Sequence, residues 1–468
     1  MTDQLPTTIE ECHALIENLL KVIEQMQLRQ EKMQAEIDDL RSKLNRHSGN
    51  SHQPPSLDGF KRRVKSAMPK KQGTKGGQIG HQGKTVQMVQ MPDQVKVCEP
   101  ESCQCGKTKW VGEGQIVERR QVFDLPDPRL EITEYLRVVK SCECGETVSG
   151  KFPEAVTAPV QYGVKVQAMT ALLSVHGCLS YEKISQLFSD LYGYQLNEAT
   201  AQTMVEKTAQ QMPVAQIREA IIESELVHFD ETGIRECGKT RWLHTASTSE
   251  LTYQFVDAKR GVAAMRSEKS VLPEFAAVAM HDCWASYFSF GQMEHALCNA
   301  HIMRELAAII ENEQSRWGAE MKELLLELYV ASNYGKAVVK EISKYEEQYE
   351  AILLRGAIEE PPPERVNEKG KLKRTKGRNL LERLSKYKES VIMFAKREEV
   401  PFTNNQAERD IRPLKVKQRV CGSFRSEKGS ESYARIYSFI STLRKKKREV
   451  FAELKSVLEG NPFVLSQP

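Results

Sequence analysis

Residues 225–234 read ELVHFDETGI, and this stretch decides the fold. Three of the four residues before Asp230 are apolar and suited to a buried strand, and two acids, Asp230 and Glu231, then stand side by side. The pattern predicts a strand that ends at Asp230 and carries a carboxylate at its tip. Because neighbouring strand residues point to opposite faces, Glu231 is expected to support the following turn rather than to bind a metal.

Four more strands are expected downstream. WLHTAST (242–248) and LTYQFVDA (251–258) predict two antiparallel strands, and AAVAMHD (276–282) and HALC (295–298) predict a fourth and a fifth, with a helix-compatible stretch at 261–275. The order β-β-β-α-β-α-β is that of the ribonuclease-H-like fold, in which the first and fourth strands are neighbours. Asp282 ends the fourth strand, so its carboxylate is expected beside that of Asp230, at the edge where open α/β sheets bind ligands.

A third acid is expected from TNNQAERDIRPLK (403–415), which begins with capping-type residues and continues as a helix containing Glu408. Two carboxylates bind a hard cation weakly, and two-metal phosphoryl transfer needs a further oxygen ligand. The basic residues that follow suit a polyanion: Arg409, Arg412, Lys415, Lys417 and Arg419. A charged surface helix is the alternative interpretation.

The bulk composition indicates a multidomain protein. The chain has 468 residues, is 40% hydrophobic and carries a net charge of +4. It contains neither an apolar run long enough for a membrane span nor a signal-peptide pattern at its start, so no membrane partner and a cytoplasmic location are expected. Close pairs among the eleven cysteines favour metal binding over disulfides.

The N-terminal segment predicts a coiled coil over residues 9–45, followed by a basic arm. Apolar residues recur at heptad a and d positions, with Gln30 at an a position expected to fix register; a helix packed on its own chain is the alternative. Between Asp58 and Asp93 there are no acids but several Lys and Arg residues, which favours nucleic-acid contact over a solvated linker.

Two matching turns, SCQCG (102–106) and SCECG (141–145), offer four thiolates, the number that a structural zinc site requires. The expected ligands are Cys103, Cys105, Cys142 and Cys144, with Cys98 as a substitute; ordinary reduced cysteines are the alternative. Residues 162–212 predict two helices separated by Gly193, the second capped by Asn197, an outline shared by helix-turn-helix domains and by many hairpins that never bind DNA.

The chain resembles the transposases of the insertion sequence 66 family along nearly its whole length. The resemblance is carried by the zipper, NSHQPPSLD, GGQIGHQGKT, the cysteine turns, HFDETGIR, HDCWASY, CNAHIMREL and TNNQAERDIRPLK. It implies an Asp-Asp-Glu triad of Asp230, Asp282 and Glu408 that holds two Mg²⁺ ions, with one structural Zn²⁺ elsewhere. Cys298, His301 and Arg304 match a Cys-x-x-His-x-x-Arg signature of the family, located between the second and third acids. The Cys-x-Cys spacing and the stretch VCGSFRSEKG depart from the family pattern.

The expected organisation follows from these features. It is a coiled coil at 1–47, a basic linker at 48–92, a zinc-binding domain at 93–150, a helix-turn-helix-like DNA-binding domain at 151–222, a catalytic domain at 223–311 and 401–440, a helical insertion at 312–400 and a basic C-terminal helix at 441–468. Residues expected to support the site or contact DNA are Trp242, His301, Arg304, Asn405, Arg409 and Arg412.

The expected function is DNA transposition, with cleavage of the element's ends and strand transfer into target DNA. The expected partners are double-stranded DNA, further copies of the chain and accessory proteins of the same element, in a bacterial cytoplasm at the nucleoid. Two alternatives remain open: a zinc-containing DNA-binding regulator without catalysis, and a ribonuclease-H-like nuclease or resolvase that cuts without joining.

Overall fold

The computed structural model describes residues 8–51, 58, 86–362 and 374–465. The chain divides into two compact units, one of residues 1–69, 154–187 and 195–468 and the other of residues 70–153 and 188–194. Much of the basic arm predicted between Asp58 and Asp93 lies outside the described residues. Among the described residues, no helix has the length and apolar character needed to cross a bilayer.

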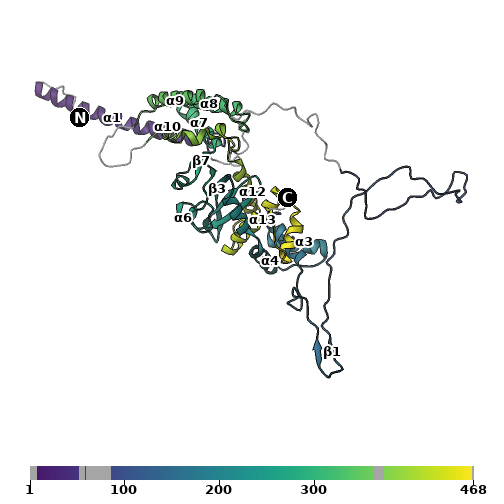
Figure 1. Cartoon of the computed structure of the whole chain (residues 1–468). Coiled ribbons are helices and arrows are strands. Elements are labelled where there is room, and N and C mark those ends of the chain that lie inside the picture. The colour runs from purple at the N-terminus through teal and green to yellow at the C-terminus, as the bar shows by residue number, and fades with distance from the viewer. Residues whose placement is uncertain (1–7, 52–57, 59–85, 363–373, 466–468) are drawn as a thin grey trace, which may run out of the picture. The chain divides into compact units, whose positions relative to one another are not determined.

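The first unit is built on a five-stranded mixed sheet (Figure 1). Its strands are β3 (Leu226–Glu236), β4 (Lys239–Ser247), β5 (Thr252–Asp257), β6 (Val278–His281) and β7 (Glu294–Leu297), in the order β5-β4-β3-β6-β7. β3 pairs with β4 and β4 with β5 in antiparallel fashion, whereas β3 with β6 and β6 with β7 are parallel. The prediction that the first and fourth strands are neighbours is confirmed.

The prediction that the first strand ends at Asp230 is wrong, because β3 continues to Glu236. Its second half pairs with β4 through a two-residue turn, Cys237 and Gly238, which have φ values of 48° and 76°. Such hairpin turns need positive φ at both positions, and Cys-Gly is not among the dipeptides that announce one. Glu231 therefore lies within a strand and supports no turn. The helix expected at 261–275 is reduced to α6 (Val262–Met265), and a 3₁₀ turn (Tyr287–Ser289) connects β6 to β7.

One hydrophobic core joins the sheet to helices from both ends of the unit. These helices are α2 (Val164–Val175), α4 (Glu198–Gln211), α5 (Val214–Ile222), α13 (Glu427–Lys445) and α14 (Val450–Leu458). α13 packs on β5 and α4, and α14 packs on α2. Helices α2, α4 and α5, which lie within the stretch 151–222 that was expected to form a DNA-binding domain of its own, therefore share the core of the sheet. The expected cap of α4 is confirmed, since the Asn197 side chain accepts the Ala199 N–H at 2.9 Å.

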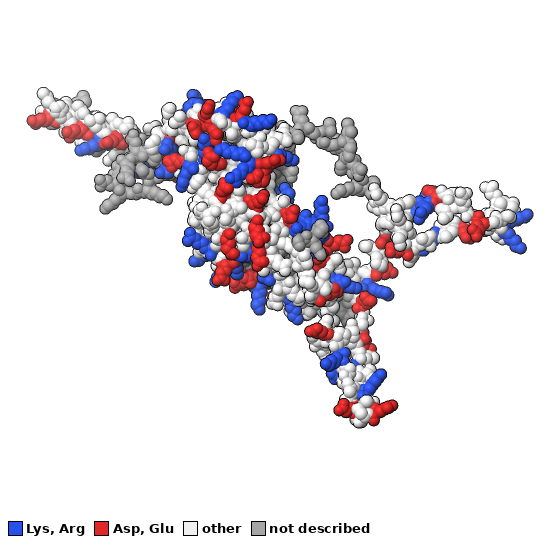
Figure 2. All heavy atoms as spheres, in the orientation of Figure 1, with Lys and Arg blue, Asp and Glu red and all other residues white. Residues whose placement is uncertain are grey.

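A second core holds the helical insertion. This core is formed by β6, β7 and five helices, of which α7 lies largely before the predicted insertion and the others belong to it. The helices are α7 (Asn299–Glu313), α8 (Arg316–Ala331), α9 (Ile342–Glu359), α10 (Lys376–Lys386) and α11 (Lys388–Lys396). On the face shown in Figure 2, positive and negative side chains are intermixed over α8 and α9. Pairs such as Arg355 with Glu320 account for this mixture. The insertion therefore offers a balanced surface there rather than a basic one.

One basic helix was expected over 441–468, and this prediction is wrong. The basic run at 444–448 spans the break between two helices. α13 ends at Lys445, Lys447 has a φ of 57°, and α14 begins at Val450. The half-buried Lys445 forms an ion pair with the buried Asp410, and Arg448 pairs with Glu453 at 2.6 Å. Part of this run is therefore structural.

α1 (Ile9–Leu44) is a single helix of 36 residues with an exposed apolar seam, as the heptads predict. Its self-association stays a prediction. The residues after it form a turn against α7, where Asn50 is buried and its Nδ2 donates to Glu311 Oε2 at 2.6 Å. The second unit contains a two-stranded ribbon of β1 (Val139–Ser141) and β2 (Thr147–Ser149), and nearly all its described side chains are exposed.

Candidate active site

Three acids from separate parts of the chain lie near one another on one face of the sheet, although among the described residues their carboxylate oxygens do not form a group within 4.8 Å of one another. The pairing of β3 with β6 ends at His228, opposite Met280. Asp230 lies just beyond this point on β3, after Phe229. Asp282 comes directly after β6, and Glu408 lies in the first turn of α12 (Asn405–Cys421), which packs across β3 and β4. All three side chains are half-buried. Asp230 and Asp282 therefore lie near the same end of the paired part of β3 and β6, as expected, although β3 continues beyond Asp230 to Glu236.

Burial and nearby negative charge together set the electrostatics of this site. The pKa of Asp230 is raised well above its usual value, first by burial and then by the negative charges of Glu231, Asp282 and Glu408. A carboxylate that feels the negative charges of neighbouring carboxylates, all of them oxygen donors, matches what a hard divalent cation such as Mg²⁺ binds. The donor set therefore fits the metal that the sequence predicts, with Asp230, Asp282 and Glu408 as the residues that would hold it.

The second acid of the pair, Glu231, faces the opposite side of the sheet. Its Oε1 accepts two hydrogen bonds from Arg260, at 2.8 and 2.7 Å, and its Oε2 accepts one from the Tyr287 hydroxyl at 2.7 Å. The Arg260 guanidinium in turn lies 5.0 Å from the Trp242 ring centroid and 4.2 Å from that of Trp284. The Glu231 carboxylate is thus engaged by Arg260 and Tyr287, although its charge still acts on Asp230, and Trp242 packs on Arg260.

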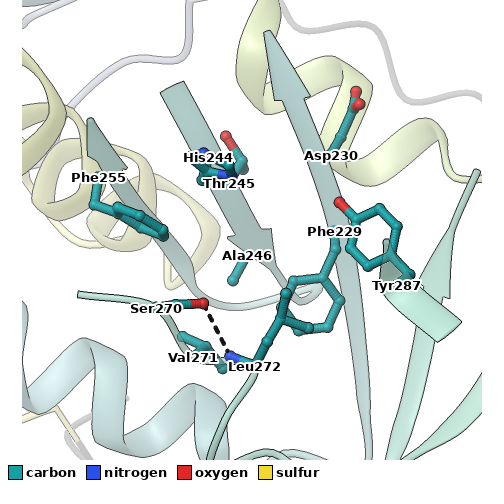
Figure 3. A pocket seen from close by; sticks show the side chains of 10 residues that line it. All are labelled: Phe229, Asp230, His244, Thr245, Ala246, Phe255, Ser270, Val271, Leu272 and Tyr287. Carbon is teal, nitrogen blue, oxygen red and sulfur yellow. Dashed lines mark hydrogen bonds between the residues drawn. The ribbon is translucent and has the colours of Figure 1, made fainter. Parts of the chain in front are cut away.

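The cavity that touches Asp230 is small. It has a volume of only about 10 Å³ and is lined by Phe229, Asp230, Ala246, Leu272 and Tyr287 among others. Figure 3 shows that the Asp230 carboxylate points away from these apolar side chains. The cavity has room for about one water molecule, so a nucleotide cannot enter it. A substrate must approach from the face that carries the acids.

Comparison with known families identifies the chain. Residues 159–432, which include all three acids, match the model of the transposase IS66 family. The chain belongs to the transposase IS66 family. Residues 2–87 match a second family, whose function is unknown. A search of curated proteins finds no match.

In this IS66 family member, Asn404 ties the acids to one another, a role that the sequence did not reveal. Its side chain does not cap α12. Instead Oδ1 is 2.9 Å from His228 Nδ1 and Nδ2 donates to the Phe229 carbonyl at 2.7 Å. Burial lowers the His228 pKa to about 4, so this imidazole is neutral at pH 7. Asn404 therefore fixes the start of α12, and with it Glu408, to the strand that carries Asp230.

A second missed feature is a buried ion pair behind α12. The Asp410 carboxylate accepts hydrogen bonds from Lys445 at 2.7 Å and from Thr252 at 3.1 Å, and it also bonds Ser247. Lys445 donates further to the carbonyls of Thr248 and Leu251. This network fastens α12 to β4, β5 and α13 on the side away from Glu408. It gives the third acid a rigid support.

The exposed face of α12 carries the residues expected to contact DNA. Asn405, Arg409, Arg412 and Arg419 recur at helical spacing and are all exposed. Lys415 donates a hydrogen bond to the Gly233 carbonyl at 2.7 Å. Desolvation lowers the pKa of Lys415, and the nearby negative charge of Asp230 partly offsets this lowering. A basic track thus begins beside the acids.

The transposase signature residues on α7 also reach the site. Cys298 immediately precedes α7, and ligand atoms of Cys298, His301 and Glu408 all lie within 4.8 Å of one another. Arg304 is one turn further along the helix. Within the described ranges, its Nε is buried without a hydrogen-bond partner, which suits a group that receives a phosphate.

The predicted zinc ligands form two matching turns in the second unit. Cys103 N–H donates to the Lys107 carbonyl at 2.8 Å and Cys142 N–H to the Glu146 carbonyl at 2.7 Å. Gly106 and Gly145 complete the turns with φ values of 81° and 91°. Hydrogen bonds from the backbone N–H, and then from the thiol, of Cys105 and Cys144 lower the pKa values of Cys103 and Cys142. Among the described residues, however, the four sulfurs are not gathered into one cluster, so the zinc site stays a prediction.

Proposed function

We propose that this transposase uses two Mg²⁺ ions held by Asp230, Asp282 and Glu408 to cut the ends of its element and join them to target DNA. One observation carries the proposal: the Asp230 carboxylate on β3 feels the negative charges of Asp282, which follows β6, and of Glu408 on α12. The strand order β5-β4-β3-β6-β7 supports the ribonuclease-H-like assignment of this domain.

The protein's part in the chemistry is to hold and orient. Bound Mg²⁺ would supply Lewis acidity at phosphorus and activate first a water and then the freed 3′-hydroxyl. The Asp230 backbone position is set by pairing with Thr245, and the Asp282 carboxylate is held by the Trp284 N–H at 3.0 Å. Glu408 is set by the helix that Asn404 and Asp410 fasten. No covalent bond between the protein and DNA is required.

DNA would be held by phosphate contacts around the acids. Arg409, Arg412 and Arg419 extend along α12 from Glu408, and Arg304 offers a buried guanidinium nitrogen on the adjoining helix. Such contacts position a backbone without reading sequence, so binding by this face should weaken steeply with salt.

The remaining parts of the proposal concern assembly. The exposed apolar seam of α1 supports self-association as a coiled coil, and the paired cysteine turns support one structural zinc ion. The helices α3 (Tyr181–Tyr192) and α4 flank Gly193, whose φ is 64°, in a helix-turn-helix-like order suited to DNA. We retain accessory proteins of the same element as partners and a location at the bacterial nucleoid as parts of this proposal, together with the domain boundaries at 1–47, 48–92 and 93–150.

The test is incubation of purified protein with DNA carrying the element's own ends, with Mg²⁺ or with EDTA. We expect nicked ends and joined products that need the metal. Nicks without joined products would instead indicate a nuclease or resolvase, and binding without nicks would indicate a regulator.

A further inference from the structure

We propose that Cys298, His301 and Glu408 form a second metal site, for a thiophilic divalent cation such as Zn²⁺, which takes Glu408 away from the Mg²⁺ cluster and stops cleavage. The sulfur, imidazole nitrogen and carboxylate oxygen of the three residues lie within 4.8 Å of one another. Their effect on cleavage rests on the proposed function, but binding of the cation does not.

The segments that carry these ligands are fixed against one another. The Asn404 N–H donates to Cys298 Sγ at 3.2 Å, which joins the residue before α12 to the residue before α7. The Asn299 N–H donates to the Phe402 carbonyl at 3.0 Å, and the Asn299 side chain donates to the Val391 carbonyl at 2.9 Å. His301 follows in the first turn of α7. The three ligands are therefore brought together by backbone contacts that need no metal.

The donor set selects a different cation from the triad. One sulfur, one nitrogen and one oxygen suit Zn²⁺ or Co²⁺ with a fourth position left for water, whereas Mg²⁺ prefers oxygen ligands alone. As the metal–sulfur bond forms, the Cys298 S–H bond breaks and its proton passes to solvent, so one proton is released for each cation bound.

Glu408 is the link between the two sites. Its ligand oxygen lies within 4.8 Å of Cys298 Sγ, and its negative charge adds to burial in raising the pKa of Asp230, so the carboxylate lies near both sites. A carboxylate drawn onto a cation at Cys298 and His301 is no longer available to the cluster at Asp230 and Asp282. Occupancy by zinc should therefore compete with Mg²⁺-dependent chemistry.

The binding test uses full-length protein carrying Cys103→Ser and Cys142→Ser, which removes one thiol from each cysteine turn, and Co²⁺ as the probe. We expect one bound Co²⁺ with a thiolate-to-cobalt absorption band. Adding Cys298→Ser should abolish the band, and adding His301→Asn should weaken Co²⁺ binding about 10-fold or more. Adding Cys421→Ser, which changes a thiol outside the cluster, should leave the band unchanged. An absent band, or a band that survives Cys298→Ser in a folded protein, overturns the site.

The inhibition test compares the Zn²⁺ concentration that halves the Mg²⁺-dependent cleavage rate of each protein. That concentration should rise about 10-fold or more in Cys298→Ser relative to Cys421→Ser. Equal concentrations in the two variants overturn the competition. If neither protein cleaves DNA, the proposed function fails, while the cobalt band still reports independently on the site.

Discussion

The face that carries the acids and the segment that carries the cysteine turns are organised in opposite ways. Around Asp230 the sheet is covered by α12 and α13, and the neighbouring polar groups of His228, Asn404 and Asp410 are buried and hydrogen-bonded. Residues 86–153 bury almost none of their side chains, although two tight turns recur within them. The comparison teaches that an apolar core can hold a charged site in place without a ligand, whereas the cysteine segment has no such core to hold its turns together.

The largest effect should come from removing the cysteines. We expect about one zinc per chain in the wild type, and loss of that zinc in Cys103→Ser/Cys142→Ser, because structural zinc supplies the folding free energy that a coreless segment lacks. Metal analysis and amide hydrogen exchange of residues 86–153 measure both quantities. The melting temperature of the sheet unit should stay unchanged, and a zinc content that survives both substitutions would place the ligands elsewhere.

The next effect is on the sheet unit itself. Lys445→Met leaves the Asp410 carboxylate buried without its cation and should lower the free energy of unfolding by about 3–5 kcal/mol. The neighbouring Lys446→Met breaks only a surface pair with Glu250 and should change it by less than about 1 kcal/mol. Chemical denaturation of the two variants provides the measurement. Equal free energies of unfolding in the two variants would mean that the ion pair behind α12 does not stabilise the sheet unit.

A smaller effect, of opposite sign, should come from Asp230→Asn in metal-free protein. The folded-state pKa of Asp230 is raised, so the folded protein holds this proton more tightly than the unfolded chain, and stability falls as the pH rises above about 4. Removing the ionisation should raise the free energy of unfolding at pH 7 by about 1 kcal/mol and flatten its pH dependence. The exposed Glu427→Gln serves as the charge-matched control. A destabilised Asp230→Asn protein would contradict the crowding of the three acids.

How much was predictable depends on how local each signal is. Asp282 was placed correctly because an apolar strand runs directly into it, and Glu408 because a helix start precedes it. Asn404 and Asp410 could not be placed, since their partners His228 and Thr252 lie 176 and 158 residues away in the sequence. The length of β3 was missed because its second half is held by pairing with β4 and not by its own apolar pattern. The zinc site and the coiled coil remain predictions, since each depends on a metal or a second chain.

The central claim is that Asp230, Asp282 and Glu408 act as one metal-dependent unit, and Glu408→Gln tests it most directly. The substitution keeps size and hydrogen-bonding capacity but removes the charge that Mg²⁺ binds, so cleavage of element ends should fall by about 10³-fold or more. Binding to the same DNA, measured over a salt series, should match the wild type, and Glu427→Gln, an acid in the first turn of α13, should cleave normally. Near wild-type cleavage by Glu408→Gln in Mg²⁺ would contradict the claim.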